Sequence, residues 1–236
     1  FEGHPVAAVA ATSEAIARQA LALIKVDYKV LPHVIDVADA MKPNAPVLHD
    51  HLLTEGANPP ATKPSNIAKR IEFAKGDAKG AFARAEIVVE KSFSTQPVHQ
   101  GYIEPHAALA SATEDGQVQL WTTTQGHFQV RGFCSRLLDI ETSQIRVTAT
   151  EIGGGFGGKT VVYLEPLAIK LSQKAGKPVK MTMTREEVFR ATGPAPGADM
   201  TVKLGATRDG RIVAASIRID MQAGAFPGSP VGPAAM

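Results

Sequence analysis

The apolar residues near the start of the chain change their spacing twice. Between residues 6 and 9 they suit an extended strand, whereas from 16 to 24 they recur at intervals of three and four residues. The second spacing predicts an amphipathic helix, which Thr12 or Ser13 can cap. Between 26 and 30, apolar and charged residues alternate, and this pattern predicts another strand. The N-terminal stretch therefore predicts strand, helix, strand.

A proline-rich stretch comes next. Prolines occupy positions 43, 46, 59, 60 and 64. Proline fixes φ and lacks a backbone donor, so this density leaves little room for regular structure between residues 42 and 64. We expect a linker or a loop that follows the surface.

The remainder of the chain is richer in strands. Alternating apolar and polar positions predict two single strands and two hairpins, with the hairpin turns at Glu114–Gly116 and at Asp209–Gly210. The single strands cover residues 85–96 and 144–152, and the hairpins cover 107–125 and 198–225.

Two helices are predicted in the same region. In residues 125–140, Val130, Phe133, Leu137 and Leu138 fall on one helical face. Residues 160–179 are also helical in pattern, and Gly176 and Pro178 would end that helix. Because Pro166 lies inside the pattern, the helix either begins near Glu165 or kinks there. The fold class is α+β, with mixed and antiparallel strands.

Composition narrows the range of functions. The chain has 236 residues, 44% of them hydrophobic and 20% charged, which is typical of a globular protein. Lysine and arginine (25) nearly balance aspartate and glutamate (23) and are scattered singly, so we expect no nucleic-acid surface. No apolar run approaches the roughly 18 residues of a membrane span. The one cysteine, Cys134, cannot form an internal disulfide, which favours a cytoplasmic setting. Since Phe1 is the first residue, we expect a piece of a longer protein.

A glycine-rich loop, "TEIGGGFGGKT" at Thr150–Thr160, carries the strongest candidate chemistry. The residues Gly153, Gly158, Lys159 and Thr160 match the pattern of a phosphate-binding P-loop. One interpretation is therefore a nucleotide-binding protein that hydrolyses ATP or GTP. The plainer alternative is a tight turn with structural glycines.

The surrounding pattern does not favour the P-loop. A P-loop nucleotidase follows its loop with several strand–helix units and needs a buried acidic residue for magnesium. Here the stretch after Thr160 predicts one helix and a polar-faced hairpin. The best magnesium candidate is Asp220, but the segment before it alternates and suits a half-exposed strand.

Four blocks in order point elsewhere. "GGGFGGK" is preceded by "TTTQGHFQVR", by "HQGYIEPHAALA" and by the N-terminal "GHPVAAVAATSEAIARQALALIKVDYKVLP". Together they resemble the large subunit of the molybdenum hydroxylases, the family of xanthine dehydrogenase, aldehyde oxidase and aerobic carbon monoxide dehydrogenase. The resemblance covers nearly the whole chain. It implies that residues 1–64 are the C-terminal half of an α/β hammerhead domain with a proline-rich linker. Residues 65–236 would be the first part of a molybdopterin-binding domain.

The resemblance also implies the cofactor-binding residues. In the family, the backbone at the positions that correspond to Gly155, Phe156 and Gly157 faces the molybdenum centre and its pterin. The glutamine matching Gln125 hydrogen-bonds an oxygen on molybdenum without binding the metal. The alternatives are a core phenylalanine at a turn and a helix-capping glutamine. No residue of this chain matches a metal ligand or the catalytic glutamate, which in the family lies further along the subunit.

Other residues are interpreted as structural. His99, Glu104 and His106 could be drawn as a metal cluster, but we interpret the block around Glu104 as structural. Cys134 is expected to be a buried helix residue, and Arg131 a residue of the helix surface or of a partner contact.

Two positions depart from the family pattern. Thr160 replaces the acidic residue that purine-oxidising members carry just after the glycine loop, which counts against xanthine as substrate. Ile103 replaces a methionine that is common before the Glu-Pro pair. Neither change alters the expected cofactor contacts.

The implied function is the hydroxylation of an electron-poor carbon, in an aldehyde or aromatic heterocycle, with oxygen from water. The cofactor would be molybdopterin with molybdenum, in the cytosine dinucleotide form. Iron–sulfur clusters and FAD would lie on partner subunits or domains of an oligomeric parent enzyme. We expect this chain alone to hold no cofactor and to be inactive. A P-loop nucleotide-binding protein and a non-catalytic cofactor-docking module are the alternatives.

Overall fold

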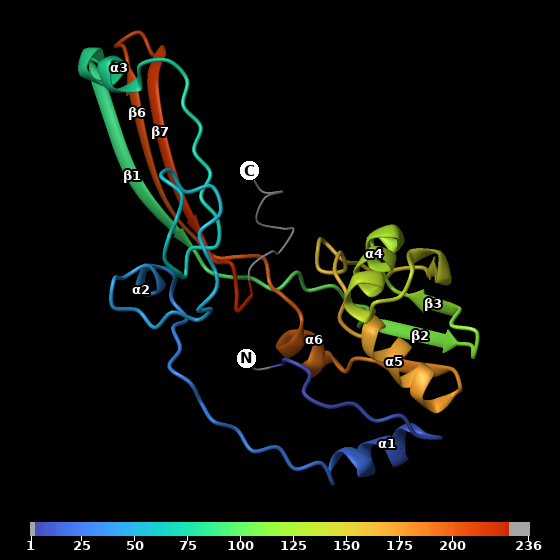
Figure 1. Cartoon of the computed structure of the whole chain (residues 1–236). Helices are drawn as coiled ribbons and strands as arrows, with labels where there is room; N and C mark the ends of the chain where they lie inside the picture. The colour runs from blue at the N-terminus through green and yellow to red at the C-terminus, as the bar shows by residue number, and fades with distance from the viewer. Residues whose placement is uncertain (1–2, 227–236) are drawn as a thin grey trace. The chain divides into compact units, whose positions relative to one another are not determined.

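A computed structural model describes residues 3–226, and these form two compact units that interleave along the chain. The first unit combines residues 3–28 with 99–195, and the second combines 29–98 with 196–226. Each unit has a sheet of its own (Figure 1). The domain division at residue 64 stays a prediction.

The first unit contains a mixed four-stranded sheet of order β4-β3-β2-β5. Its central pair is the predicted hairpin, in which Leu120 lies opposite Ala110 and Gly116 takes a φ of 86° in the turn. β4 runs parallel to β3, whereas β5 runs antiparallel to β2. The strands are β2 (Ala107–Ala112), β3 (Val118–Thr122), β4 (Ile145–Ala149) and β5 (Val179–Thr182).

Helices cover this sheet and complete its core. They are α4 (His127–Leu138), the 3-10 helix η1 (Thr142–Gln144), α5 (Glu165–Ala175) and α6 (Arg185–Ala191). α5 begins at Glu165 with Pro166 in its first turn, so the first of the two alternatives for this helix is confirmed. Gly176 ends it in the left-handed conformation, as expected. α5 packs against β2 and α4 packs against β4, and their buried side chains join those of the strands in one core cluster.

The buried face of α4 differs from the predicted face. Val130 and Cys134 are fully buried and Leu138 packs partly against the core, whereas Leu137 is 64% exposed and Phe133 is half-buried. The core stripe therefore runs through positions four apart, with small Cys134 at its centre. The prediction chose the large apolar residues instead and placed the stripe too far round the helix.

The N-terminal segment confirms its helix but not its strands. α1 (Glu14–Leu21) is capped by Ser13, whose hydroxyl accepts a hydrogen bond from the Ile16 amide at 3.3 Å. The strands predicted at 6–9 and 26–30 do not form. A strand needs a neighbouring backbone to satisfy its donors and acceptors, and the described part of the chain pairs none with these residues. The α/β hammerhead arrangement expected for residues 1–64 is therefore not seen beyond its helix.

The second unit contains an antiparallel sheet of order β1-β6-β7. The predicted hairpin joins β6 and β7, with Gly210 at a φ of 87° in its turn. The strands are β1 (Ile87–Thr95), β6 (Ala198–Ala206) and β7 (Ile212–Met221), and the helices of this unit are α2 (Val37–Ala40) and α3 (Ala78–Arg84). Residues 42–64 contain no helix or strand, as their prolines predicted.

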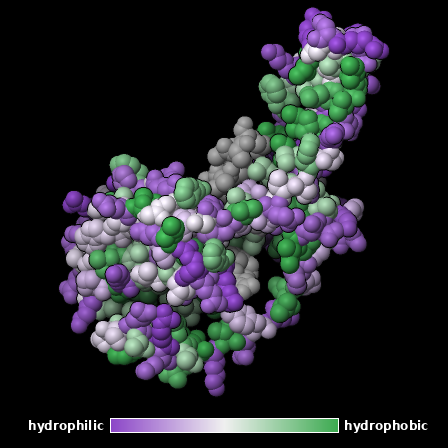
Figure 2. All heavy atoms as spheres, turned by 180° about the vertical axis from the view of Figure 1, so that it is seen from behind, coloured by the Kyte–Doolittle hydropathy of each residue, from purple (hydrophilic) through white to green (hydrophobic). Residues whose placement is uncertain are grey.

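The sheet of the second unit is apolar on one face. Strand alternation and register place Val89, Phe93, Leu204, Ile217 and Ile219 on that face, all at least partly exposed. Figure 2 shows apolar surface gathered over this unit. The opposite face carries polar pairs such as Glu90 with Lys203. No helix among the described residues is long and apolar enough to cross a membrane.

Candidate functional site

The glycine loop links the end of β4 to the start of α5. Its backbone turns sharply, because Gly154, Phe156 and Gly157 have φ values of 93°, 48° and 87°. Glycine takes this left-handed region freely, but a phenylalanine there costs about 1–3 kcal/mol. The Phe156 ring is nonetheless 74% exposed, so burial does not offset that cost. A strained residue that presents an apolar ring to the outside is typical of a functional contact.

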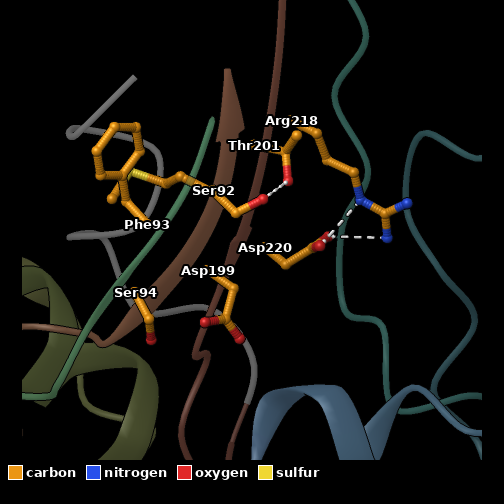
Figure 3. Close-up of a pocket in the computed structure, with 8 residues that line it drawn as sticks. Ser92, Phe93, Ser94, Asp199, Thr201, Arg218 and Asp220 are labelled. Atoms are coloured by element: carbon orange, nitrogen blue, oxygen red, sulfur yellow. Dashed lines mark hydrogen bonds and ion pairs between the residues drawn. The ribbon is translucent and has the colours of Figure 1, made fainter. Parts of the chain in front are cut away.

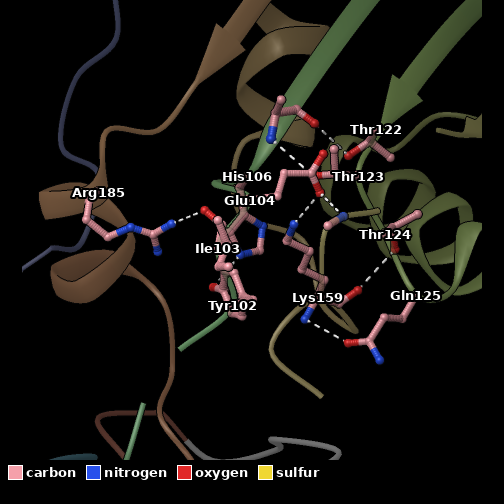
Figure 4. A network of polar contacts seen from close by, with 12 residues as sticks. Tyr102, Ile103, Glu104, His106, Thr122, Thr123, Thr124, Gln125, Lys159 and Arg185 are labelled. Atoms are coloured by element: carbon pink, nitrogen blue, oxygen red, sulfur yellow. Dashed lines mark hydrogen bonds and ion pairs between the residues drawn. The ribbon is translucent and has the colours of Figure 1, made fainter. Parts of the chain in front are cut away.

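Gln125 lies at the corner between β3 and α4, directly against this loop (Figure 4). Its side-chain Oε1 accepts hydrogen bonds from the backbone amides of Gly157 at 3.0 Å and Lys159 at 3.2 Å. Its own backbone amide donates to the Lys159 carbonyl at 2.9 Å, and the Thr124 hydroxyl donates to the same carbonyl at 3.1 Å. The structure thus brings together the residues that the sequence analysis proposed as cofactor contacts.

These contacts determine which atoms of the Gln125 side chain remain available for hydrogen bonding. The N-cap of α4 is Gly126, and no side chain caps this helix, so Gln125 is not a helix cap. Its oxygen is occupied by the loop. Among the hydrogen bonds of the described residues, its Nε2 has none, and the side chain is exposed. Two N–H donors therefore stand beside the loop with their direction set by the locked oxygen.

Two glycines permit this close approach. A Cβ on Gly155 would lie 2.6 Å from Gln125 Oε1, and a Cβ on Gly158 would lie 2.6 Å from a ring carbon of Tyr102. Such distances are shorter than any real contact. The loop could not rest on either side chain with larger residues at these positions.

Lys159 points inward. It is 1% exposed, and its Nζ donates to Glu104 Oε2 at 2.7 Å and lies 5.0 Å from the centre of the Tyr102 ring. Glu104 Oε2 also accepts a hydrogen bond from the Gly153 amide at 2.8 Å. Burial opposes ionisation of Glu104, but the hydrogen bonds from Lys159 and Gly153 outweigh it and lower the pKa of this carboxyl.

The orientation of Lys159 does not fit a P-loop, in which the lysine reaches the phosphates of the nucleotide. The magnesium candidate fits no better. Asp220 belongs to the second unit and already accepts a hydrogen bond from Arg218 Nε at 2.9 Å. Lys159 and Asp220, the two charged residues on which the nucleotidase interpretation depends, therefore each pair with another residue of this chain.

The histidines of the predicted structural block belong to a buried network. The Tyr102 hydroxyl donates to Thr192 Oγ1 at 3.2 Å and lies 2.7 Å from His106 Nε2. His99 Nε2 lies 3.0 Å from the same threonine oxygen. Burial, assisted by the charge of Lys159, lowers the pKa of His106 to about 4, so this ring is neutral at physiological pH. No group of three His, Cys, Asp or Glu residues suited to a metal occurs in the described residues.

Two residues of α4 complete the comparison with the sequence. Cys134 is fully buried in α4, which confirms the expected buried helix residue, and burial raises the pKa of its thiol to about 12. Arg131 is half-buried on α4. Its guanidinium lies 5.5 Å from the Phe128 ring centre, and its Nε is buried without an acceptor among the described residues. Its expected place, on the helix surface or in a partner contact, stays a prediction.

Sequence reasoning missed the roles of Glu104 and Lys159. The P-loop pattern drew attention to the lysine as a phosphate ligand, and its inward orientation depends on a carboxylate 55 residues earlier. One signal for this pairing was available in the sequence. Glu104 lies in the "GYIEPH" block, and this block precedes the glycine loop in the family pattern.

A groove of the described residues lies in the second unit, on the polar face of its sheet (Figure 3). It measures about 500 Å³, and four of its polar groups pair with one another: Ser92 with Thr201 at 3.1 Å, and Arg218 with Asp220. None of the predicted cofactor contacts lines it.

Comparison with known proteins gives concordant matches. Residues 60–236 match the protein family described as "Molybdopterin cofactor-binding domain". The whole chain is 32% identical to a probable xanthine dehydrogenase subunit of Bacillus subtilis and covers 30% of it. Over 96% of its length, it is 35% identical to the carbon monoxide dehydrogenase large chain of Afipia carboxidovorans, of which it covers 28%.

Solved structures agree. The chain superposes on reconstituted CO dehydrogenase from Oligotropha carboxidovorans with a TM-score of 0.76 and 31% identity, covering 87% of this chain and 26% of that one. It superposes on quinoline 2-oxidoreductase from Pseudomonas putida 86 with a TM-score of 0.73 and 30% identity, covering 89% and 25%. The chain therefore spans less than a third of these four relatives.

Proposed function

This chain belongs to the family of molybdopterin cofactor-binding domains, as its sequence blocks indicated, and we propose that Gln125 and the loop at Gly155, Phe156 and Gly157 hold one side of that cofactor in a molybdenum hydroxylase large subunit. One observation carries the proposal. The Gln125 oxygen is locked by the loop amides of Gly157 and Lys159, while the Gln125 side chain and the strained Phe156 ring of the same loop stay exposed.

Each residue has a specific task in this proposal. Gln125 would help to hold the cofactor through a hydrogen bond from Nε2 to a polar group of its metal centre, and a neutral amide would do so without adding charge or becoming a ligand. Phe156 supplies an apolar wall that keeps water from one side of the centre. The amides of Gly154, Gly155 and Phe156 make no hydrogen bond among the described residues and so can donate to an anionic group.

The residues present fit the cofactor. Polar donors gather on this loop, and the Glu104 carboxylate is paired with Lys159 rather than free to repel an anion. The one acidic residue of the loop itself, Glu151, lies at its start, before the glycines. When bound, molybdopterin supplies a molybdenum centre that accepts two electrons as a carbon is hydroxylated with oxygen from water. The side chains of this chain bind and orient that centre. They provide no general base for the reaction.

The substrate class follows from what the site lacks. The relatives' names refer to xanthine, carbon monoxide and quinoline, so the likeness to them concerns the cofactor rather than one substrate. Thr160 donates its hydroxyl to the Gly157 carbonyl at 2.9 Å and offers no carboxylate to a purine. We therefore assign the parent enzyme an electron-poor carbon in an aldehyde or a non-purine heterocycle.

The rest of the active site would lie outside this chain, because the chain spans less than a third of the xanthine and carbon monoxide dehydrogenase relatives. In this proposal, the glutamate base and the cradle for a cytosine dinucleotide come from other parts of the large subunit. Iron–sulfur and flavin subunits carry the electrons away.

The test is Gln125→Ala in the complete enzyme that contains this chain. Loss of one preorganised hydrogen bond, worth about 2–4 kcal/mol in such sites, predicts a fall in kcat of roughly 30- to 1,000-fold. Gln119→Ala, on an exposed position of β3, is the matched control and should leave kcat unchanged. Molybdenum content and Tm are measured for both. If Gln125→Ala turns over like the wild type at equal molybdenum content, the proposal is wrong.

A further inference from the structure

Glu104 reaches the glycine loop on both sides of its turn. Its Oε2 accepts from the Gly153 amide at 2.8 Å, before Phe156, and from Lys159 Nζ at 2.7 Å, after it. Its own amide donates to the Gly153 carbonyl at 3.2 Å. A single residue outside the loop thus fixes the spacing of the two loop ends.

Lys159 connects Glu104 to Gln125, because it contacts both residues. The side chain of Lys159 has no exposed surface, and its charge is paired only with Glu104 among the ion pairs of the described residues. Its backbone amide and carbonyl hold Gln125 from both sides, through Gln125 Oε1 and the Gln125 backbone amide. A shift of the buried ammonium would therefore move both backbone groups that orient the glutamine.

The loop needs such an anchor. Five of its residues are glycines, whose conformational freedom makes an ordered loop costly. A Cβ on Gly157 would meet nothing within 4 Å, and Phe156 is exposed, so side-chain packing does not hold the tip of the turn at these two residues. A buried ion pair adds little net stability, because desolvation offsets its attraction, but it specifies one geometry where the pairing is complete.

We infer that the Glu104–Lys159 ion pair is a positioning device for the molybdopterin site, which holds the Phe156 turn and the Nε2 donors of Gln125 in place for the cofactor. This inference rests on the proposed function of the loop. Glu104 acts through Lys159 and Gly153 and is a positioning residue.

Hydrogen–deuterium exchange of the complete enzyme tests the inference without relying on turnover. In Glu104→Asp the charge stays but the carboxylate is one methylene short, so we expect amides of residues 150–160 to exchange at least tenfold faster. Peptides from β2 and β3 should be unchanged. Glu90→Gln breaks a Glu–Lys pair of the second unit, with Lys203 at 3.1 Å and both side chains exposed, and should leave the loop unaffected.

A second pair of variants protects the test against misfolding. Glu104→Gln leaves the Lys159 charge buried and unpaired, which can prevent folding. Combining Glu104→Gln with Lys159→Gln restores an uncharged hydrogen-bonding pair, and we expect it to recover slow loop exchange in part. Turnover of Glu104→Asp should show a kcat lowered at least tenfold at unchanged KM and molybdenum content.

The outcomes separate the two proposals. Wild-type exchange rates in the loop of both Glu104→Asp and the double variant would overturn the positioning role. Faster loop exchange in Glu104→Asp, together with a wild-type enzyme that contains no molybdenum, would support the positioning role and overturn the proposed function.

Discussion

Lys159 is the residue whose surroundings most change its interpretation. In the sequence it completes a P-loop pattern, and in the structure it is buried against Glu104 and Tyr102. The same ammonium cannot hold a phosphate outside and a carboxylate inside. A motif defined by residue type at fixed spacing specifies where the backbone turns but not where a long side chain points.

The first prediction follows from that orientation. ATP with magnesium should produce no thermal shift, because Lys159 does not face the loop exterior. Lys159→Ala should lower the free energy of unfolding by about 1–3 kcal/mol, a value reduced from that of a fully buried pair because Glu104 is partly exposed. Differential scanning fluorimetry with and without ATP measures both effects. A shift of several degrees with ATP that Lys159→Ala abolishes would restore the nucleotidase interpretation.

The second prediction concerns His106. Burial, and then the charges of Lys159 and His99, lower its pKa to about 4, against an opposing effect of Glu104. A folded-state pKa below the unfolded value of about 6.5 means that the unfolded chain binds the proton first. The stabilisation is therefore complete above pH 6.5 and is lost as the pH falls towards 4, by about 3 kcal/mol.

Urea unfolding of the wild type and of His106→Asn between pH 7.5 and 4 checks this value. The carboxylates titrate in both proteins, so the difference between the two curves isolates the histidine. We expect that difference to shrink as the pH falls below 6.5. A difference that is constant over this range contradicts the buried neutral imidazole.

At the scale of the elements, the burial of one face decides how much each helix or strand contributes to the stability of the fold. In the first unit, α5 and the mixed sheet bury a shared core. In the second, the apolar face of β1, β6 and β7 is partly exposed over its whole length. Strand alternation is equally clear in both sheets, so the pattern marks which face is apolar but not whether it is covered.

Two isoleucines test this contrast. Ile169 on α5 has no exposed surface, whereas Ile217 on β7 is 61% exposed. Ile169→Ala should cost about 2–5 kcal/mol, because it removes buried methyl groups and leaves a cavity, and Ile217→Ala should cost less than about 1 kcal/mol. Chemical denaturation of both variants gives the two values. Equal costs would show that the apolar face of the second unit is buried in solution.

At the scale of the molecule, the two units interleave along the chain. Each is built from two sequence segments, and a segment of the other unit lies between them. The glycine loop and Gln125 belong to the first unit together with the N-terminal helix α1. The proposed cofactor contacts therefore all lie within one unit, and the chain spans less than a third of the xanthine and carbon monoxide dehydrogenase relatives.

From this we predict that the isolated chain binds no stoichiometric molybdenum and hydroxylates no substrate. If this chain supplies only one side of the proposed site, most of the cofactor stays in water and binding is weak. Metal analysis and dye-reduction assays on the purified chain provide the measurement. Stoichiometric molybdenum with measurable hydroxylation would contradict the proposal that other parts of the large subunit complete the site.

The sequence alone determined most of the local structure. The hairpins at Gly116 and Gly210, the start of α5 at Glu165 and the irregular proline-rich stretch all followed from short-range rules. Turn chemistry, helix caps and hydrophobic period act between near neighbours, so they are readable from the chain. The family resemblance was equally accessible, because it lay in contiguous blocks of residues.

Only the tertiary structure decided which groups meet. The strands predicted at 6–9 and 26–30 did not form, because pairing needs a distant partner that no local pattern reveals. Lys159 turned inward because Glu104, far away in sequence, offered a carboxylate at 2.7 Å. Gln125 became a locked donor because the fold delivered two loop amides to its oxygen. Long-range contacts depend on how whole elements pack, and that free energy is not a property of any single segment.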